Sequence, residues 1–203
     1  LEELFTNLEN ILASESSLCY DYEYDRIICF GELISTTIIS DYLKMEGIEN
    51  QFIDIRKFLK TDQNYRNANI DLELSEQLCK EAFDFKASST FVTQGFIAGT
   101  RTNQTTTLGR EGSDYTAALL ANLLNAENVT IWKDVPGVMN ADPKEYEKAQ
   151  VISRMSYKEA IELSHFGAKV IHPKTIKPIQ NKQIPLYVRS FLHPESEGTV
   201  IQE

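Results

Sequence analysis

Short apolar runs alternate along this chain with segments in which apolar residues recur at helical spacing. The apolar runs predict strands, at residues 26–30, 51–55, 89–97, 128–132 and 184–190. Helices are predicted between them, at residues 31–45, 71–84 and 115–124, from Ser156 onward and from Pro173 onward. Alternation of this kind is typical of a layered α/β sandwich with a mainly parallel central sheet, and we expect that fold class here.

In a mainly parallel sheet, ligands bind beyond the carboxyl ends of the strands. Glu32, Asp134, the turn at residues 97–100 and the glycine-containing loop at residues 105–114 each come directly after a predicted strand. We therefore expect these segments to converge on one edge of the sheet.

The chain starts with a helical pattern and without an initiator Met. The apolar positions of this pattern are Leu1, Leu4, Phe5, Leu8, Ile11 and Leu12. They predict that the sequence begins inside a helix and is a piece of a longer protein. A processed terminus or missing leading residues is the alternative.

Charge, cysteine content and hydropathy limit the kinds of partner and the location that we expect for this protein. The 203 residues carry a net charge of -10, whereas nucleic-acid binding requires clustered Lys and Arg, so a nucleic-acid partner is not expected. Cys19, Cys29 and Cys79 are odd in number and form no C-x-x-C pair, which favours a reducing, cytoplasmic location. No apolar run approaches the length of a membrane span, and no membrane partner is expected.

The loop at residues 105–114 has the residue types of an anion site. Gly109 and Gly112 let the backbone approach a ligand, and the following helix offers free N–H groups at its positive end. Arg110 adds a planar cation suited to a carboxylate or a phosphate. An ordinary polar loop, with Ser113 as a helix cap and Arg110 in a surface ion pair, explains these residue types equally well.

Other charged residues are ambiguous when taken one at a time. Glu32 could bind an ammonium group, or it could be a first-turn acid that complements a helix dipole. Lys144 and Lys169 could contribute to a nucleotide site or be solvated surface lysines. His165, His172 and His193 show no metal-ligand spacing, so metal held by protein ligands is not expected; Mg²⁺ brought by a nucleotide stays open.

Six motifs, in order along the chain, resemble those of the aspartate kinases, members of the amino-acid kinase family. They are residues 30–35 (FGELIS), 93–97 (TQGFI), 105–118 (TTTLGREGSDYTAA), 131–143 (IWKDVPGVMNADP), 156–162 (SYKEAIE) and 166–173 (FGAKVIHP). The resemblance runs from about residue 26 to residue 201 and implies the amino-acid kinase fold. It also implies a homo-oligomer for the full-length protein.

By this resemblance, the protein transfers the γ-phosphate of ATP to the side-chain carboxylate of L-aspartate, the first step toward lysine, threonine and methionine. Arg110 would hold the α-carboxylate of aspartate and Glu32 its amino group. The other substrate residues implied are Thr107, Glu111, Gly112, Ser113 and Asp114, the last with a catalytic role. The residues implied at ATP are Lys133, Asp134, Met139, Lys144 and Lys169, with Lys169 at the phosphates.

The sequence departs from the family pattern at three of these positions. Glu111 stands where Gly is common, Lys133 where Thr is common, and Met139 where an aromatic residue is common. The family's opening K-F-G-G-T-S segment and its regulatory domains have no counterpart in residues 1–203. We therefore expect these residues to be a partial catalytic domain with little or no activity alone, since a phosphate-cradling turn and a lysine would be absent.

Two other functions stay open at this stage. The chain could belong to a kinase of the same fold that acts on glutamate, acetylglutamate or a nucleotide. It could also be a non-enzymatic assembly fragment. Glu32 together with residues 110–114 favours a free α-amino acid as the substrate.

Overall fold

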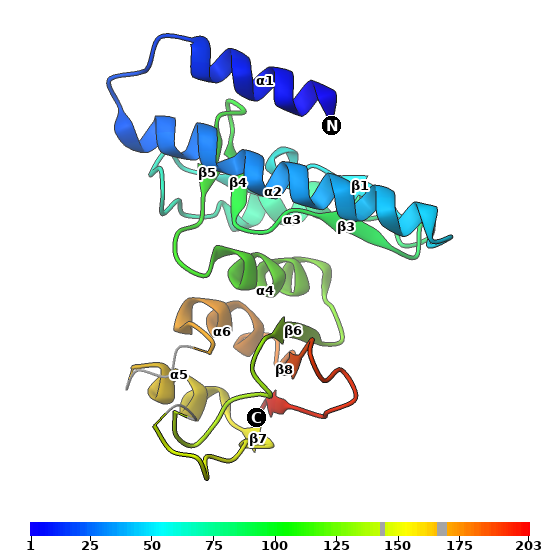
Figure 1. Ribbon diagram of the computed structural model, residues 1–203, viewed down its shortest axis with the longest axis vertical. Helices are drawn as coiled ribbons and strands as arrows, with labels where there is room; N and C mark the ends of the chain where they lie inside the picture. The colour runs from blue at the N-terminus through cyan, green and yellow to red at the C-terminus, as the bar shows by residue number, and fades with distance from the viewer. Residues whose placement is uncertain (143–144, 166–169) are drawn as a thin grey trace. The chain divides into compact units, whose positions relative to one another are not determined.

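The computed structural model describes residues 1–142, 145–165 and 170–203, which divide into two compact units, Leu1–Ser113 and Asp114–Glu203 (Figure 1). Each unit combines helices with short strands. In the described residues, four strand pairings are parallel and two are antiparallel. The expected α/β class is therefore confirmed.

The first unit contains three helices, a 3-10 helix and two small sheets. Its elements in chain order are α1 (Glu2–Ala13), α2 (Tyr20–Met45), β1 (Gln51–Ile53), η1 (Ile55–Lys57), β2 (Lys60–Thr61), α3 (Leu72–Ala82), β3 (Phe91–Thr93), β4 (Ile97–Thr100) and β5 (Thr105–Thr107). β1 pairs with β3 in parallel, and β4 lies between parallel β2 and antiparallel β5. Helix α2 packs on β5 and β3. Its buried face therefore lies beside the strand that leads into the loop at residues 108–113.

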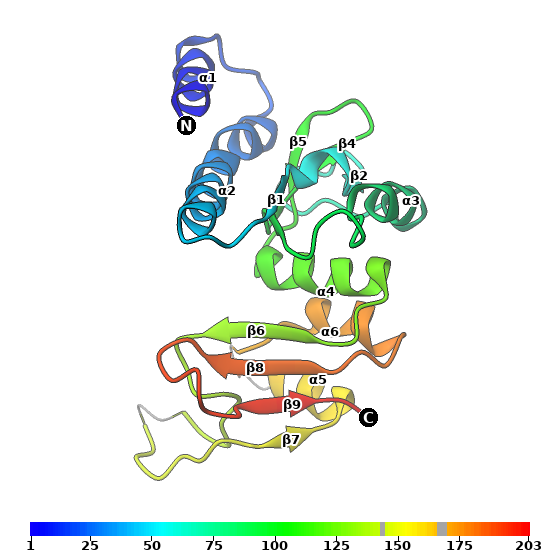
Figure 2. The ribbon, with the colours of Figure 1, turned by 90° about the vertical axis from the view of Figure 1, so that its right-hand side faces the viewer.

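The described residues of the second unit contain one four-stranded sheet with the order β6-β8-β9-β7 (Figure 2). Its elements are α4 (Gly112–Leu124, which begins at the unit boundary), β6 (Val129–Lys133), β7 (Arg154–Met155), α5 (Tyr157–His165), α6 (Pro173–Gln180), β8 (Leu186–Ser190) and β9 (Thr199–Ile201). Its core includes Ile131, Tyr157, Ile176 and Leu186. The core fixes the sheet whose β6 strand ends at Lys133.

Local signals placed several helices correctly. The predicted first helix is α1, and the Asp71 carboxylate accepts the Leu74 N–H at 3.2 Å at the start of α3. Ser156 and Glu159 form the expected capping box, in which the Glu159 carboxylate accepts the Ser156 N–H at 2.7 Å. Pro173 opens α6 as predicted.

The predicted strand at residues 26–30 is wrong, because these residues lie inside α2, which already begins at Tyr20. The buried positions of this helix are Asp25, Cys29, Phe30, Leu33 and Ser40. They recur at helical spacing, while Ile27 and Ile28 between them are 38% and 42% exposed. Four consecutive apolar residues cannot by themselves distinguish a strand from one turn of a half-buried helix.

The predicted strand at residues 89–97 is two strands in different sheets. β3 ends at Thr93 and β4 begins at Ile97, and the bend between them places Phe96 at a φ of +68°. A positive φ is rare for a side chain of this size, so tertiary contacts must hold the bend in place.

Helix α2 is the longest helix described, and none of the described helices is long and apolar enough to cross a membrane.

Candidate functional site

The loop after β5 is held against the bend at residues 94–96. The Leu108 N–H donates to the Phe96 carbonyl oxygen at 2.8 Å. A Cβ atom added at Gly112 would lie 2.7 Å from Cδ2 of Phe96, so this close approach requires glycine. Gly109 has a φ of +78°, and a Cβ atom there would lie 3.1 Å from the Arg66 carbonyl oxygen. The two glycines thus allow the loop backbone to pack closely against Phe96 and Arg66. Their expected approach to a ligand stays a prediction.

Arg110 presents its guanidinium group to solvent from this loop. Its side chain is 70% exposed, and the nearest carboxylate oxygen, on Glu111, lies 4.0 Å from Nε. Glu111 has a φ of +53° and a side chain that is only 20% exposed. Its Oε2 atom is buried and has no hydrogen-bond partner among the described residues. The loop therefore presents one solvent-exposed cation, on Arg110, and one carboxylate, on Glu111, with an oxygen that has no hydrogen-bond partner among the described residues.

Thr107 lies at the end of β5 and is fully buried. Its hydroxyl donates to Oδ1 of Asp25 at 2.7 Å, and its N–H donates to Oδ2 at 2.8 Å. Asp25 Oδ2 also accepts the Arg66 N–H at 2.8 Å. The hydroxyl hydrogen of Thr107 is thus already committed, so Thr107 positions the loop rather than donating to a ligand.

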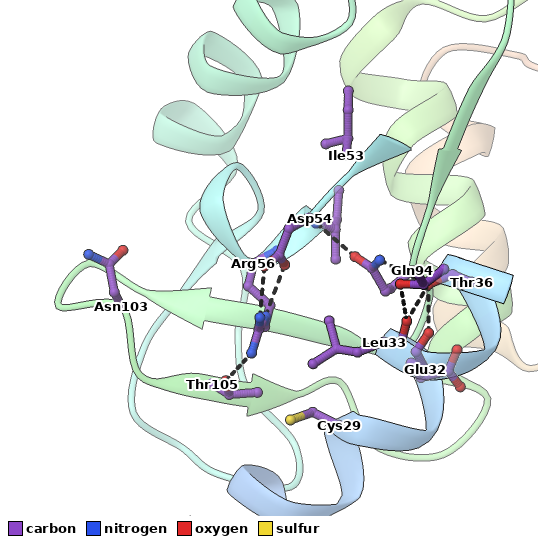
Figure 3. Close-up of polar contacts among 12 residues, drawn as sticks. Cys29, Glu32, Leu33, Thr36, Ile53, Asp54, Arg56, Gln94, Asn103 and Thr105 are labelled. Carbon is purple, nitrogen blue, oxygen red and sulfur yellow. Dashed lines mark hydrogen bonds and ion pairs between the residues drawn. The ribbon is translucent and has the colours of Figure 1, made fainter. Parts of the chain in front are cut away.

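Glu32 lies near the middle of α2 and not at the end of a strand, so both its predicted strand-end position and its alternative position in a first helical turn are wrong. Glu32 is half-buried, and burial raises the pKa of its carboxyl group above the usual range. Within the described residues, its carboxylate forms no hydrogen bond or ion pair. Figure 3 shows the Glu32 side chain pointing away from Gln94 and Thr36. A half-buried carboxylate without a partner is suited to an incoming cationic group.

The second unit contains the residues predicted at the nucleotide. Lys133 ends β6, and its Nζ lies 2.6 Å from Oδ2 of Asp114 in the first turn of α4. Asp134 follows β6 directly, as expected, and is exposed. Met139 is partly buried and forms an isolated antiparallel bridge with Val151. Lys144 and Lys169 lie outside the described residues.

The histidines that the structure describes have local roles or face solvent. His172 caps α6, and its Nδ1 accepts the Lys174 N–H at 3.1 Å. His165 and His193 are exposed. In residues 1–142, 145–165 and 170–203, no group of three or more His, Cys, Asp or Glu side chains could hold a metal ion.

Sequence reasoning missed two side chains that position the site. Asp25 was given no role by the sequence, yet it is fully buried and accepts three hydrogen bonds. Gln94 belongs to the motif at residues 93–97, and the sequence assigned it no role. In the structure it is only 1% exposed. A polar residue inside a predicted strand, as at Gln94, was the available signal.

Residues 5–190 match the model of the amino acid kinase family, and the chain belongs to this family. It is 38% identical to lysine-sensitive aspartokinase 3 of Escherichia coli over 98% of its length, which covers 45% of that protein. It is also 38% identical over 87% of its length to bifunctional aspartokinase/homoserine dehydrogenase 2 of Arabidopsis thaliana, covering 19% of it. The chain therefore spans less than half the length of these relatives.

Solved structures agree with the family assignment. The fold superimposes on Escherichia coli aspartokinase III in complex with aspartate and ADP with a TM-score of 0.92 at 35% identity, covering 100% of this chain and 45% of that one. A UMP kinase from Bacillus anthracis has a TM-score of 0.62 at 17% identity over 90% of this chain and 70% of its own. That second likeness shows the shared fold alone.

Proposed function

We propose that residues 1–203 belong to the catalytic domain of an aspartate kinase. The reaction transfers the γ-phosphate of ATP to the side-chain carboxylate of L-aspartate and gives 4-phospho-L-aspartate, the first step toward lysine, threonine and methionine. The similarity to aspartokinases along nearly the whole chain supports this assignment. The likeness to UMP kinase, at 17% identity, does not extend to a substrate.

The observation that carries the proposal is the carboxylate of Glu32, which has no hydrogen bond or ion pair within the described part of the chain. Burial without a cationic partner in the described residues makes its charged form unfavourable in the free protein. An ammonium group of the substrate would supply that partner. This favours an amino acid over a plain dicarboxylate or a nucleotide monophosphate as the acceptor.

The loop at residues 110–113 supplies the complementary half of the recognition. Arg110 would bind the α-carboxylate of aspartate with its exposed guanidinium group, and the backbone of Glu111, Gly112 and Ser113 would support it. Thr107 contributes by fixing the start of the loop through Asp25. The acceptor carboxylate is ionised at neutral pH, so positioning and charge neutralisation rather than a strong base drive the transfer.

Residues of the second unit would hold the nucleotide. We assign Lys133, Asp134, Met139, Lys144 and Lys169 to ATP, and Asp114 and Lys169 to the transfer itself. The ion pair of Lys133 with Asp114 links the two assignments, because it places a cation beside the proposed catalytic carboxylate. Mg²⁺ would arrive on the nucleotide phosphates and would neutralise their charge when bound.

The location and assembly of the protein are part of the same proposal. The three cysteines are free thiols, two of them buried, which fits a reducing compartment such as the cytoplasm. We also expect the full-length protein to form a homo-oligomer, which light scattering can measure.

The test is aspartate-dependent ADP release from Mg²⁺-ATP, measured with the full gene product that contains residues 1–203. Arg110→Ala and Glu32→Ala should each lower kcat/KM for aspartate by about 100-fold, because each removes one charged partner of the substrate. Arg101→Ala is the matched control. The side chain of Arg101 is 72% exposed, a fraction similar to the 70% of Arg110, but Arg101 forms an ion pair with Asp71.

Glutamate, acetylglutamate and UMP complete the substrate panel. Turnover of one of these in place of aspartate would retain the family and overturn the substrate assignment. Loss of activity in Arg101→Ala equal to that in Arg110→Ala would contradict the proposed role of the loop.

A further inference from the structure

The side chain of Gln94 joins two elements that are far apart in the sequence. Its Oε1 accepts the Ile55 N–H at 3.0 Å, and its Nε2 donates to Oγ1 of Thr36 in α2 at 2.9 Å (Figure 3). The residue is 1% exposed, so water cannot replace either bond. Gln94 therefore fixes the bend after β3 to one turn of α2.

That turn of α2 carries Glu32. The Thr36 hydroxyl accepts from Gln94 and donates its own hydrogen to the Glu32 carbonyl oxygen at 2.6 Å. A hydroxyl that donates and accepts at once has a defined orientation. The position of Gln94 is thus transmitted through Thr36 to the backbone of Glu32.

The two residues after Gln94 contact the loop that carries Arg110. A Cβ atom added at Gly95 would lie 2.8 Å from Cα of Ser113, which shows how closely the two backbones approach. Phe96 packs on Gly112 through its ring and accepts the Leu108 N–H through its carbonyl group. Residues 94–96 therefore contact Glu32's turn through Thr36 and residues 108–113 directly.

We propose that residues 94–96 form a bridge that sets the spacing between the Glu32 carboxylate and the loop at residues 110–113, so that the ammonium and carboxylate groups of one α-amino acid are recognised together. This rests on the proposed function and adds Gln94 and Thr36 to it as positioning residues. Neither touches the substrate. Both act through the placement of Glu32.

Thr36→Val tests the bridge, because valine keeps the shape of threonine and removes the hydroxyl. KM for aspartate should rise about 10-fold, the effect of losing one buried hydrogen bond, while kcat and KM for ATP change by less than about 2-fold. Thr36→Ser keeps the hydroxyl and should restore KM.

Thr37→Val is the matched control. The Thr37 hydroxyl donates to the Leu33 carbonyl oxygen at 2.7 Å in the same helix, the same kind of bond that Thr36 makes to Glu32. The side chain of Gln94 bonds to Thr36 and not to Thr37. Its KM should stay at the wild-type value. An equal rise in KM in Thr37→Val would show a general effect on the helix and overturn the proposal.

Succinate is aspartate without the ammonium group, so it distinguishes a displaced Glu32 from general damage to the substrate site. Thr36→Val should leave inhibition by succinate unchanged while weakening the binding of aspartate. In a double-mutant cycle, Thr36→Val should have no further effect on KM once Glu32→Gln is present. Equal weakening of both ligands, or additive effects in the cycle, would overturn the proposal.

Amide hydrogen exchange measures the bridge without any substrate. Thr36→Val, but not Thr37→Val, should speed exchange at residues 108–113, since the bend that holds Leu108 is then anchored less firmly. Unchanged exchange in that loop would overturn the bridge. A wild-type protein that neither binds nor phosphorylates aspartate would instead overturn the proposed function, and the exchange result would still decide on the bridge.

Discussion

Glu32 is the residue at which function and stability oppose each other. Its carboxylate is half-buried and has no cationic partner among the described residues, and burial raises the pKa of the carboxyl group. The folded protein therefore holds the proton of Glu32 to higher pH than the unfolded chain does. The stability that the protonated form contributes is complete below the ordinary pKa of about 4.3 and is lost as pH rises through the folded pKa.

Glu32→Gln should consequently stabilise the protein at pH 7 while lowering kcat/KM for aspartate by about 100-fold. The gain should be about 0.5 kcal/mol or less, because solvent still screens this half-exposed group, and it should vanish below about pH 4. Urea unfolding of both proteins at pH 7 and pH 4 measures the difference. A variant that is less stable than wild type at pH 7 would mean that Glu32 has a favourable partner in the folded protein.

At the scale of elements, α2 decides where Glu32 lies. It runs without interruption from Tyr20 to Met45 and includes the apolar run that predicted a strand. Gly31 lies inside it, and a Cβ atom added there would meet no atom within 4 Å. Gly47 follows the helix with a φ of +80°, where glycine is required.

Gly31→Ala should therefore raise the free energy of unfolding by about 0.5–1 kcal/mol, since alanine loses less conformational entropy than glycine in a helix. Gly47→Ala should lower it by about 1 kcal/mol, because alanine is strained at that φ. Chemical denaturation of the two variants gives the comparison. Destabilisation by Gly31→Ala would indicate that residues 26–31 do not form a continuous helix.

At the scale of the molecule, the proposed substrate and nucleotide residues belong mostly to different compact units. Glu32 and residues 107–113 belong to Leu1–Ser113, while Asp114, Lys133, Asp134 and Met139 belong to Asp114–Glu203. The boundary falls in the first turn of α4, not in a linker, so no change of composition marked it in the sequence.

This division predicts which residues each ligand protects from amide hydrogen exchange. Aspartate should slow exchange in residues 30–34 and 108–113, and ADP with Mg²⁺ should slow it in residues 130–139. Mass spectrometry of peptides from the full gene product resolves these segments. Protection of residues 108–113 by ADP alone would contradict the assignment of the loop to the amino acid.

The sequence by itself determined the features that depend on neighbouring residues and on motif order. The capping box at Ser156, the start of α6 at Pro173, the strand β6 before Asp134 and the amino acid kinase family were all predicted correctly. These follow from interactions within a few residues, or from motifs that can be read directly.

Only the tertiary structure decided how the substrate residues are supported. Thr107 and Asp25 are separated by 82 residues, and Gln94 and Thr36 by 58. The same contacts decide that residues 26–30 continue a helix, because the side of this run that is buried depends on what packs against it. Partners so distant leave no periodic pattern in the sequence, since a hydrogen bond between them forms only after the chain has folded and brought them together.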